Sequence, residues 1–330
     1  MGACQRILVT GANGFIGSAL TKAMISEGLH VRMASRTCPS DMEILGGEWA
    51  PLPDLAGPVD WTPILEGMDT VIHLAGMAHR FESNVVSDWG LYDRVNHLAT
   101  KSLVSAILGH PSVKRFLFMS TCRVHGDASV LPIRADSPIT PVTPYDKSKA
   151  DAEAAVASVL GSSQIRWAIL RPVVVYGQGN RGNMARLEGL LRHHIPIPVG
   201  CVPNCRSFLF IGNLVSAIRT YVTSPNPPTG RAWIVSDEEV VSTETLVRTM
   251  CMVGAMNLPA RVVHLPDWLL AWTARAGDIF DRLGLPAPWN SEVKGKLLGN
   301  FYVDLESIKQ ELGWQPPYTL EEGIRITFSG

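Results

Sequence analysis

The stretch RILVTGANGFIG, residues 6–17, decides the fold of this chain. A short apolar run ends at Thr10, a glycine-rich turn follows at once, and an amphipathic run then extends to Gly28. This order predicts a strand, a tight turn and a helix that stops at a glycine. Glycines at such a turn let a pyrophosphate reach free N–H groups and the positive end of the helix dipole. The residues predicted to line this dinucleotide site are Gly11, Asn13, Gly14, Phe15, Ile16 and Gly17.

The end of the second predicted strand, residues 30–34, bears on which dinucleotide binds. Sites that prefer NAD place an acid there to bond the ribose 2′-hydroxyl, whereas an arginine accommodates a 2′-phosphate. This chain has Ser35 and Arg36 and no acid at that point. A guanidinium and a hydroxyl suit a phosphate that a carboxylate would repel. The sequence therefore favours NADP(H), with NAD(H) and a merely solvated Arg36 as the alternatives.

Composition narrows the class of protein further. The 330 residues suffice for one large domain or two smaller ones, and a net charge of -1 makes no case for nucleic acid or an anionic membrane as the main partner. No apolar run approaches the ~18 residues of a membrane span, and the start of the chain lacks the pattern of a signal peptide. Six scattered cysteines indicate free thiols in a reducing cytoplasm, not a metal site.

Strand and helix patterns alternate through the first half, which predicts an α/β fold with a doubly wound, Rossmann parallel sheet. After Arg171, prolines and glycines break the chain into shorter pieces. We expect residues 1–172 to form the dinucleotide-binding domain and residues 173–330 a smaller, mixed substrate domain. A segment at about 205–236 is expected to return to the first domain, and the strand at 206–211 is the candidate to rejoin the main sheet. The other elements predicted are strands at 70–75, 114–120, 166–170 and 232–235, and helices at 88–108 and 144–160.

A tyrosine and a lysine four residues apart open the helix at 144–160. Tyr145 and Lys149 share one helix face and can point together at the carboxyl edge of the sheet. A free phenol titrates near ~10, but a nearby ammonium and a positive nicotinamide ring favour the phenolate. Thr121, or Ser120 beside it, stands at the end of an apolar strand and would hold the substrate oxygen. The order of these features, more than the Tyr-Lys pair alone, predicts nicotinamide redox chemistry on a carbonyl or hydroxyl.

These residues resemble the extended short-chain dehydrogenase/reductases, in particular the nucleotide-sugar epimerase/dehydratase group. TGANGFIG, DTVIHLAG, MSTCRVHG, PYDKSK and LRPVVVYG follow one another in the order typical of that group. The resemblance gives Thr121, Tyr145 and Lys149 the catalytic roles, and it implies that Asn96 supports the backbone of the active site. The further residues it places at the cofactor are Leu74, Ala75, Gly76, Asn96, Tyr145, Lys149 and Pro172. The residues expected to contact the substrate are His79, Arg123, Asn183 and Arg206, of which Arg206 and Asn183 would bind the nucleotide diphosphate.

Departures from the family pattern exclude one reaction. Dehydratases of the group follow the catalytic threonine with Asp-Glu, whereas this chain has Cys122 and Arg123. A thiol and a permanently charged guanidinium cannot replace that acid–base pair, so a 4,6-dehydratase is not expected. His125 replaces the usual tyrosine of Val-Tyr-Gly and would either touch the sugar or pack inside. Asn213 replaces the usual aspartate of a later motif.

Reduction and epimerisation would use the same threonine, tyrosine and lysine. The end of the chain is most similar to bacterial O-antigen enzymes that act on UDP-linked 6-deoxy-4-keto-N-acetylhexosamines. Because Arg36 favours an exchangeable NADP(H), the preferred hypothesis is a 4-ketoreductase with Tyr145 as proton donor. A UDP-sugar 4-epimerase with tightly bound NAD is the alternative. The remaining rivals are a small-molecule ketone reductase and a non-catalytic NADP-binding regulator, against which the intact Tyr145–Lys149 pair counts.

The sequence also predicts a dimer contact and an amphipathic helix. By resemblance, the helices at 88–108 and 144–160 are expected to form a homodimer. Trp268 and Trp272, four apart beside Leu269 and Leu270, predict an amphipathic helix. Core packing is the first interpretation of the two tryptophans, and a membrane-facing patch is the second.

Overall fold

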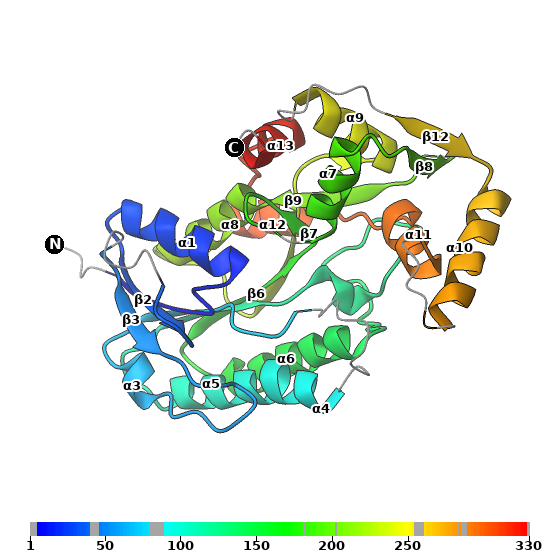
Figure 1. Cartoon of the computed structure of the whole chain (residues 1–330). Helices are drawn as coiled ribbons and strands as arrows, with labels where there is room; N and C mark the ends of the chain where they lie inside the picture. Colours follow the sequence, from blue (N-terminus) through cyan, green and yellow to red (C-terminus); the bar gives the residue numbers. More distant parts are fainter. Residues whose placement is uncertain are drawn as a thin grey trace.

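The structure of the chain is a computed structural model. It describes residues 5–39, 46–78, 89–180, 182–201, 203–253, 261–282, 284 and 289–328. Within these ranges, no helix combines the length and the apolar character needed to cross a membrane. Figure 1 shows a large sheet with helices on both faces, and a second group of smaller elements beside it.

The main sheet has seven strands in the order β10-β6-β5-β4-β1-β2-β3, and every neighbouring pair is parallel. Six of them keep the 3-2-1-4-5-6 order of a Rossmann fold, and β10 extends the sheet beyond β6. The predicted α/β Rossmann fold is therefore confirmed. The strands are β1 (Arg6–Thr10), β2 (His30–Ser35), β3 (Glu48–Pro51), β4 (Thr70–His73), β5 (Arg115–Met119), β6 (Arg166–Pro172) and β10 (Arg231–Val235).

Alternation along the strands sends side chains into two hydrophobic cores, one on each face of the sheet. Ile7 and Val9 of β1 face one core, and Leu8 between them faces the other; all three are fully buried. Helices α1 (Phe15–Ser26), α8 (Ile211–Thr223) and α12 (Glu306–Leu312) cover the first face. Helices α3 (Thr62–Leu65), α5 (Ala99–Leu108) and α6 (Pro144–Leu160) cover the second (Figure 1).

The helix predicted at 88–108 is divided into three parts. Helix α4 (Trp89–Tyr92) leads into a π-helical segment, Asp93–Leu98, before α5 begins. The Thr100 hydroxyl donates a 2.6 Å hydrogen bond to the Asn96 carbonyl, so a side chain enters the backbone ladder there. Such π segments are frequent at functional sites. This one carries Asn96, whose side chain reaches the end of β4.

The C-terminal elements form two smaller sheets. Strands β11, β9 and β7 make one, and β12 pairs with β8 to make the other. The prediction that the strand at 206–211 rejoins the main sheet is wrong: β9 pairs with β7 and β11, and β10 is the strand that joins β6. The elements of this part are β7 (Val174–Tyr176), α7 (Asn183–Arg192), β8 (Ile197–Gly200), β9 (Arg206–Phe210), β11 (Val240–Val241), α9 (Thr243–Val253), β12 (Val262–Leu265), α10 (Asp267–Arg282), α11 (Ser291–Leu298) and α13 (Leu320–Phe328).

Helix α10 departs from the first interpretation of its tryptophans. Trp268 and Trp272 are 71% and 67% exposed, so they do not pack in the core. The buried residues of the helix are instead Leu270, Ala274 and Gly277, which lie on another face. The amphipathic helix is present, but its tryptophans lie on the outer side.

Candidate active site

The glycine turn is built so that no side chain fills the space before α1. Gly11 has φ +72°, and a Cβ there would lie 2.7 Å from the Ala75 nitrogen. Gly14 caps α1 with no side-chain hydrogen bond, and a Cβ on Gly17 would lie 2.2 Å from the Gly11 carbonyl oxygen. The N-terminal N–H groups of α1 are thus left for a ligand, which is the arrangement that binds a pyrophosphate. The residues of this turn fit a dinucleotide.

The rim of this turn includes the end of β2. The Asn13 side-chain amide donates hydrogen bonds to the Thr37 carbonyl and hydroxyl, at 2.5 and 3.0 Å. Ser35 is buried, and its hydroxyl donates to the Thr37 carbonyl at 2.8 Å and accepts from the Trp49 indole at 3.3 Å. Arg36 is exposed. Of the two residues predicted to recognise a 2′-phosphate, only the arginine therefore presents its polar group to solvent.

The end of β4 is held by a chain of buried polar groups. His73 is fully buried between the Thr10 hydroxyl, 2.7 Å from Nδ1, and the Thr100 hydroxyl, 3.0 Å from Nε2. Burial, followed by the Lys149 charge, lowers the pKa of His73 to about 3, so the ring is neutral. Its role is structural, as its position at a buried strand end indicates.

Asn96 clamps the segment that follows β4. Its carboxamide accepts from the Met77 nitrogen at 2.7 Å and donates to the Met77 carbonyl at 3.0 Å, and it also donates to the Ser148 hydroxyl at 3.0 Å. A Cβ on Gly76 would lie 2.9 Å from the Asn96 oxygen and 3.4 Å from the Lys149 ammonium. Residues 74–76 thus pass between the glycine turn and α6, where the resemblance placed the cofactor.

Helix α6 begins with a complete capping box. The Thr143 hydroxyl accepts from the Asp146 nitrogen, and the Asp146 carboxylate accepts from the Thr143 nitrogen at 3.0 Å. Pro144 occupies the first helical position, where a missing N–H costs no intrahelical hydrogen bond. This cap sets the direction of the first turn of α6, and Tyr145 stands in that turn.

Thr121 and Tyr145 come together at the end of β5. Thr121 is buried at the start of a short 3₁₀ helix, Cys122–His125, and its side chain hydrogen-bonds the Tyr145 phenol. Ser120 turns the other way, because its hydroxyl donates to the Glu153 carboxylate. The structure thus brings Thr121 to the tyrosine and keeps Ser120 in the protein interior.

Lys149 lies one turn further along α6. Its ammonium donates a 2.8 Å hydrogen bond to the Met119 carbonyl at the end of β5, and it sits 4.8 Å from the centre of the Phe118 ring. Burial lowers the pKa of Lys149 to about 8, and the Glu153 carboxylate opposes that change. The lysine therefore faces the ends of β4 and β5, beside Gly76.

Charged and hydrogen-bonding groups around Tyr145 shift its pKa in both directions. Desolvation by the surrounding protein, and then the Asp146 charge, raise the pKa of Tyr145 to about 12, while Arg123 and the Thr121 hydrogen bond act to lower it. Arg123 is thus a protein cation close to the phenol that the sequence analysis did not assign to it. The influence of Lys149 on the phenolate stays a prediction.

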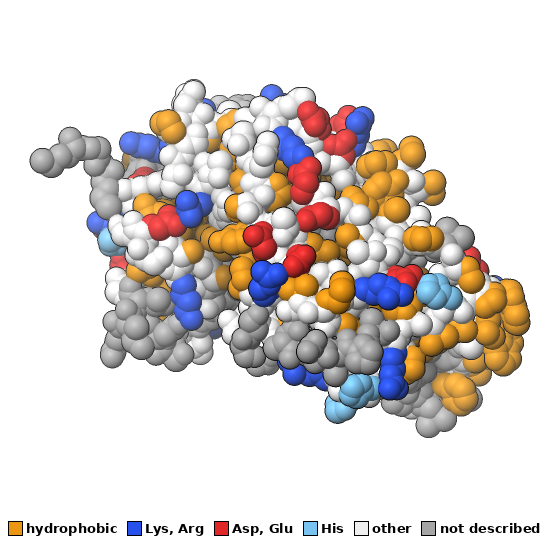
Figure 2. All heavy atoms as spheres, turned by 90° about the horizontal axis from the view of Figure 1, so that it is seen from above, with side chains coloured by type: hydrophobic (Ala, Val, Ile, Leu, Met, Phe, Trp, Pro, Cys, Tyr) orange, Lys and Arg blue, Asp and Glu red, His pale blue; other side chains and the backbone are white. Residues whose placement is uncertain are grey.

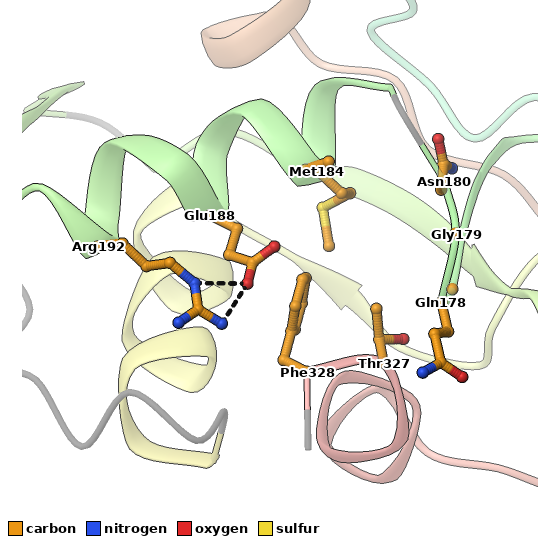
Figure 3. Close-up of a pocket in the computed structure, with 10 residues that line it drawn as sticks. Gln178, Gly179, Asn180, Met184, Glu188, Arg192, Thr327 and Phe328 are labelled. Atoms are coloured by element: carbon orange, nitrogen blue, oxygen red, sulfur yellow. Dashed lines mark hydrogen bonds and ion pairs between the residues drawn. The ribbon is translucent and has the colours of Figure 1, made fainter. Parts of the chain in front are cut away.

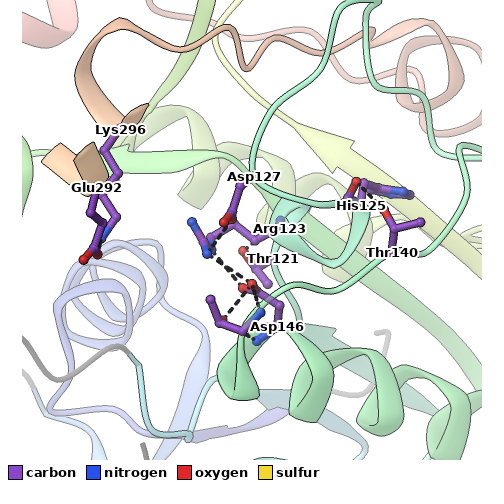
Figure 4. Close-up of polar contacts among 9 residues, drawn as sticks. Thr121, Arg123, His125, Asp127, Thr140, Asp146, Glu292 and Lys296 are labelled. Atoms are coloured by element: carbon purple, nitrogen blue, oxygen red, sulfur yellow. Dashed lines mark hydrogen bonds and ion pairs between the residues drawn. The ribbon is translucent and has the colours of Figure 1, made fainter. Parts of the chain in front are cut away.

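Arg123 itself is held by two carboxylates (Figure 4). Its guanidinium donates to Asp146 at 2.8 and 3.1 Å and forms an ion pair with Asp127 at 2.6 Å. Its side chain is 24% exposed, and Asp146 is fully buried. The structure thus places Arg123 at Tyr145 and Asp146, and its predicted contact with substrate remains a prediction.

A second buried pair lies deeper along α6. Arg171 of β6 donates to Glu153 from Nε at 3.0 and 3.1 Å and from Nη2 at 2.6 Å. Arg171 also donates to His125 Nε2 at 3.1 Å, and His125 Nδ1–H donates to the Pro138 carbonyl at 3.0 Å. Burial lowers the pKa of His125, so a neutral, packed histidine accounts for it better than contact with a sugar. This network is one that the sequence analysis missed, because its hydrogen-bonded partners are 13 to 46 residues apart.

The remaining predicted substrate residues have less defined surroundings. Arg206 is half-buried at the start of β9 and donates to the Gly299 carbonyl at 2.9 Å; burial lowers its pKa to about 10. Asn183 is the first residue of α7. His79 lies outside the described residues. Pro172, predicted at the cofactor, ends β6 opposite Val235.

Asn213 shows why an amide replaces the usual acid at its position. Its side chain donates to the buried Asp237 carboxylate at 2.6 Å and clamps the Tyr318 backbone through bonds of 2.8 and 2.9 Å. Burial raises the pKa of Asp237 to about 6. A second carboxylate at position 213 would repel Asp237, whereas an amide donates a hydrogen bond to it.

One pocket lies away from these groups, between α7, α13 and the loop at 177–180 (Figure 3). Met184 and Phe328 form its apolar side, and Glu188 and Arg192 pair with each other along α7 at 2.7 Å. Neither the glycine turn nor the Thr121–Tyr145 pair contributes to its lining. The chemistry indicated above therefore belongs to the edge of the main sheet.

Comparison with known proteins agrees with this arrangement. Residues 7–236 match the model of the NAD dependent epimerase/dehydratase family. The chain belongs to this family. It is 30% identical to the UDP-glucose 4-epimerase of Vibrio cholerae over 98% of its own length and 94% of that protein. As a member of this family, it is an NAD-dependent enzyme.

Two further proteins extend the comparison. The N-acetyl-alpha-D-glucosaminyl-diphospho-ditrans,octacis-undecaprenol 4-epimerase of Escherichia coli O157:H7 is 28% identical over 98% of this chain and 94% of its own. The structure of UDP-glucuronic acid 4-epimerase from Bacillus cereus in complex with NAD superposes with a TM-score of 0.76 at 20% identity, covering 98% of this chain and 96% of that one. The family member thus shares its fold with an enzyme that binds NAD, and the preference for NADP predicted from Arg36 is not shown.

Proposed function

We propose that this epimerase/dehydratase family member oxidises and re-reduces C4 of a UDP-linked sugar, so that its overall reaction is 4-epimerisation. The observation that carries the proposal is the Thr121–Tyr145 hydrogen bond at the carboxyl end of β5, next to a turn that fits a dinucleotide. The names of the V. cholerae and E. coli relatives, both 4-epimerases, support the reaction. They move the preference from ketoreduction, favoured by the sequence, to epimerisation.

Tyr145, Thr121 and Lys149 have different roles in the proposed reaction. A bound nicotinamide would supply the carbon that accepts a hydride and returns it. Tyr145, as the phenolate, would take the proton of the sugar 4-hydroxyl when C4 is oxidised, and the phenol so formed would return that proton when the ketone is reduced. Thr121 hydrogen-bonds the same oxygen while its charge changes. Lys149, on the same helix face, reaches the level of Gly76, where it can bind a ribose hydroxyl and keep the site positive.

Ketoreduction is the second candidate, and one observation favours it. The exposed Arg36 stands at the end of β2 with no acid beside it, which suits the 2′-phosphate of NADP(H). The substrate in that case would be a UDP-6-deoxy-4-keto-N-acetylhexosamine. The two reactions differ in what happens to the cofactor: an epimerase retains it unchanged, whereas a reductase consumes one NADPH for each product.

The test begins with the purified protein. We would identify the nicotinamide that copurifies, and then follow UDP-glucose and UDP-N-acetylglucosamine by NMR without added cofactor. Interconversion at C4 supports epimerisation. Oxidation of NADPH only with the 4-keto sugar supports reduction instead. Neither activity, combined with an unimpaired cell function of Tyr145→Phe, would make the protein a non-catalytic regulator.

Tyr145→Phe provides the decisive variant. It removes the proton carrier and should lower turnover by roughly 10²-fold or more. Tyr92→Phe is the matched control, because Tyr92 packs edge-on against Tyr145 at 6.1 Å between ring centres and holds no proton in this scheme. Equal turnover in the two variants would contradict the role of Tyr145.

A homodimer remains a prediction, and so does a separate substrate domain at 173–330. The face made by α5 and α6, with the segment before α5, exposes Leu98 and Leu108 at 45% and 51%. Light scattering tests the dimer, and Leu108→Glu should dissociate it if that face is the contact.

A further inference from the structure

Helix α10 carries an exposed stripe, which we call the outer stripe. It consists of Trp268, Trp272, Arg275, Ile279 and Arg282. These positions are spaced by four, three, four and three residues, so they lie on one face of the helix. The three apolar members are 71%, 67% and 58% exposed, in the order of the chain, and Phe280 at the edge of the stripe is 52% exposed. A contiguous apolar face of this kind marks an interaction surface.

The inner face of α10 is anchored, so the outer stripe cannot turn inward. A Cβ on Gly277 would lie 1.8 Å from the Trp289 carbonyl oxygen, which shows how closely the helix approaches the chain before α11. The Trp289 indole donates to the Thr273 hydroxyl at 3.1 Å. Leu270 and Ala274 are buried beside these contacts. Rotation of the helix would break this packing before it could cover the tryptophans.

The acidic and basic side chains of α10 lie on different sides of the helix. Asp278 accepts from the Ser291 nitrogen and hydroxyl at 2.9 and 2.6 Å, and Asp281 accepts from the Asn290 side chain at 2.8 Å. These acids therefore face the start of α11. Arg275 and Arg282 are exposed, and neither forms an ion pair with any residue in the described part of the chain. The charged members of the outer stripe are thus both arginines, and Asp278, three residues from the first and four from the second, attracts both.

We propose that the outer stripe binds the surface of an anionic lipid bilayer. Tryptophan side chains favour the boundary between headgroups and acyl chains, and arginines interleaved with them attract anionic headgroups. Figure 1 places α10 at the outer end of the molecule, with α11 between it and the main sheet. Figure 2 shows hydrophobic side chains gathered at that same end. The helix can therefore meet a flat surface without hindrance from the main sheet.

Charge argues against a second copy of the chain as the occupant. A two-fold symmetric contact places the same stripe on both partners, so it brings the arginines of both copies into one interface. Like charges opposed in an interface cost stability, whereas the phosphates of a bilayer compensate them. The net charge of -1 for the whole chain hides this local feature, because acids elsewhere balance it. The bilayer proposal does not depend on the reaction proposed above.

Flotation with lipid vesicles tests the proposal without any turnover. The full-length protein should float with vesicles of phosphatidylcholine containing about one-third phosphatidylglycerol, less with pure phosphatidylcholine, and less again at high salt. The Trp268→Ala/Trp272→Ala variant should lower the partition coefficient by roughly tenfold or more, because the apolar contact is lost. Arg275→Gln/Arg282→Gln should lower it on the anionic vesicles alone, by roughly fivefold for each arginine.

The matched control is Val130→Ala/Leu131→Ala, which removes two apolar side chains that are 88% and 73% exposed elsewhere. It should float like the unmodified protein, and thermal unfolding should show that all variants are folded. Flotation that is equal in the tryptophan variant and the control would overturn the proposal. So would a concentration-dependent dimer that the tryptophan variant abolishes, since the stripe would then bind a second copy.

Discussion

Two arginine–carboxylate pairs hold helix α6, and they differ in depth. The upper pair, Arg123–Asp146, lies beside Tyr145, and its arginine side chain is 24% exposed. The lower pair, Arg171–Glu153, lies two turns along the helix, and both of its side chains are 8% exposed. A charge near water can act on its neighbours and still be solvated, whereas a charge inside must be matched fully by the protein. The comparison therefore assigns chemistry mainly to the upper pair and stability mainly to the lower one.

Their other partners agree with this division. The upper arginine also reaches Asp127 and influences the pKa of Tyr145. The lower pair accepts a hydrogen bond from Ser120 and donates one to His125. Helix α6 thus carries reactive groups and supporting groups on successive turns.

The largest effect is expected when the lower pair is broken. Arg171→Met leaves the Glu153 carboxylate buried without its cation, which should cost about 3–5 kcal/mol of unfolding free energy. Urea denaturation measures this loss. Glu153→Gln combined with Arg171→Met should recover part of it, because the amide carries no charge and still accepts from Ser120. If Arg171→Met is as stable as the unmodified protein, the pair does not stabilise the fold.

Breaking the upper pair should change the pH dependence of kcat/KM more than it changes the unfolding free energy. Arg123→Met removes the cation that lowers the pKa of Tyr145, so the rise of kcat/KM with pH should move to higher pH, with roughly tenfold lower activity near neutrality. The stability loss should be smaller, about 1–3 kcal/mol, because Asp146 keeps its bonds to Thr143.

Two variants sharpen this second test. Arg123→Lys keeps the charge and should restore most of the pH profile. Arg134→Met breaks an exposed pair with Asp304, in which the arginine is 67% exposed, and should change neither quantity. An unshifted profile in Arg123→Met would contradict the electrostatic role of the upper pair.

Lys149 lies between the two pairs on α6. We expect its titration to change the unfolding free energy by less than the loss of either pair. Burial lowers the folded-state pKa of Lys149 to about 8, while its ordinary value is 10.5. Between these values the unfolded chain binds a proton that the folded chain lacks, so this group makes the folded state more stable as pH rises. Relative to Lys149→Met, the unmodified protein should gain roughly 1–2 kcal/mol between pH 8 and 9.5. A difference that stays constant with pH would mean that the lysine titrates normally.

The smallest effect concerns the cap that precedes the upper pair. Thr143→Ala should cost about 1 kcal/mol of stability, because the capping box loses one hydrogen bond donor and acceptor. Asn290→Ala removes the corresponding cap of α11, where Asn290 accepts from the Val293 nitrogen at 2.8 Å. The two variants should lose similar stability in thermal unfolding. Only Thr143→Ala should also lower kcat, because its helix positions Tyr145.

Local signals explain most of what could be predicted about the fold. The turn at Gly11–Gly17, the cap at Thr143 and the stop at Gly28, whose φ is +80°, each depend on residues within a few positions of one another. The alternation of strands and helices predicts the parallel sheet, because a helix that connects two strands of one sheet makes them parallel, with a right-handed crossover. The resemblance to the family rests on the same short motifs.

What the chain's sequence determined by itself is therefore the nucleotide turn, the Rossmann sheet and the helix that carries Tyr145 and Lys149. Only the tertiary structure decided that Arg123 and Asp146 lie close to the phenol of Tyr145, that β10 and not β9 completes the sheet, and that Trp268 and Trp272 face outward. Short-range hydrogen bonds and the periodic spacing of apolar residues depend only on residues that are close in the sequence. Ion pairs, strand partners and the exposed side of a helix depend on groups that are distant in the chain and meet only after folding.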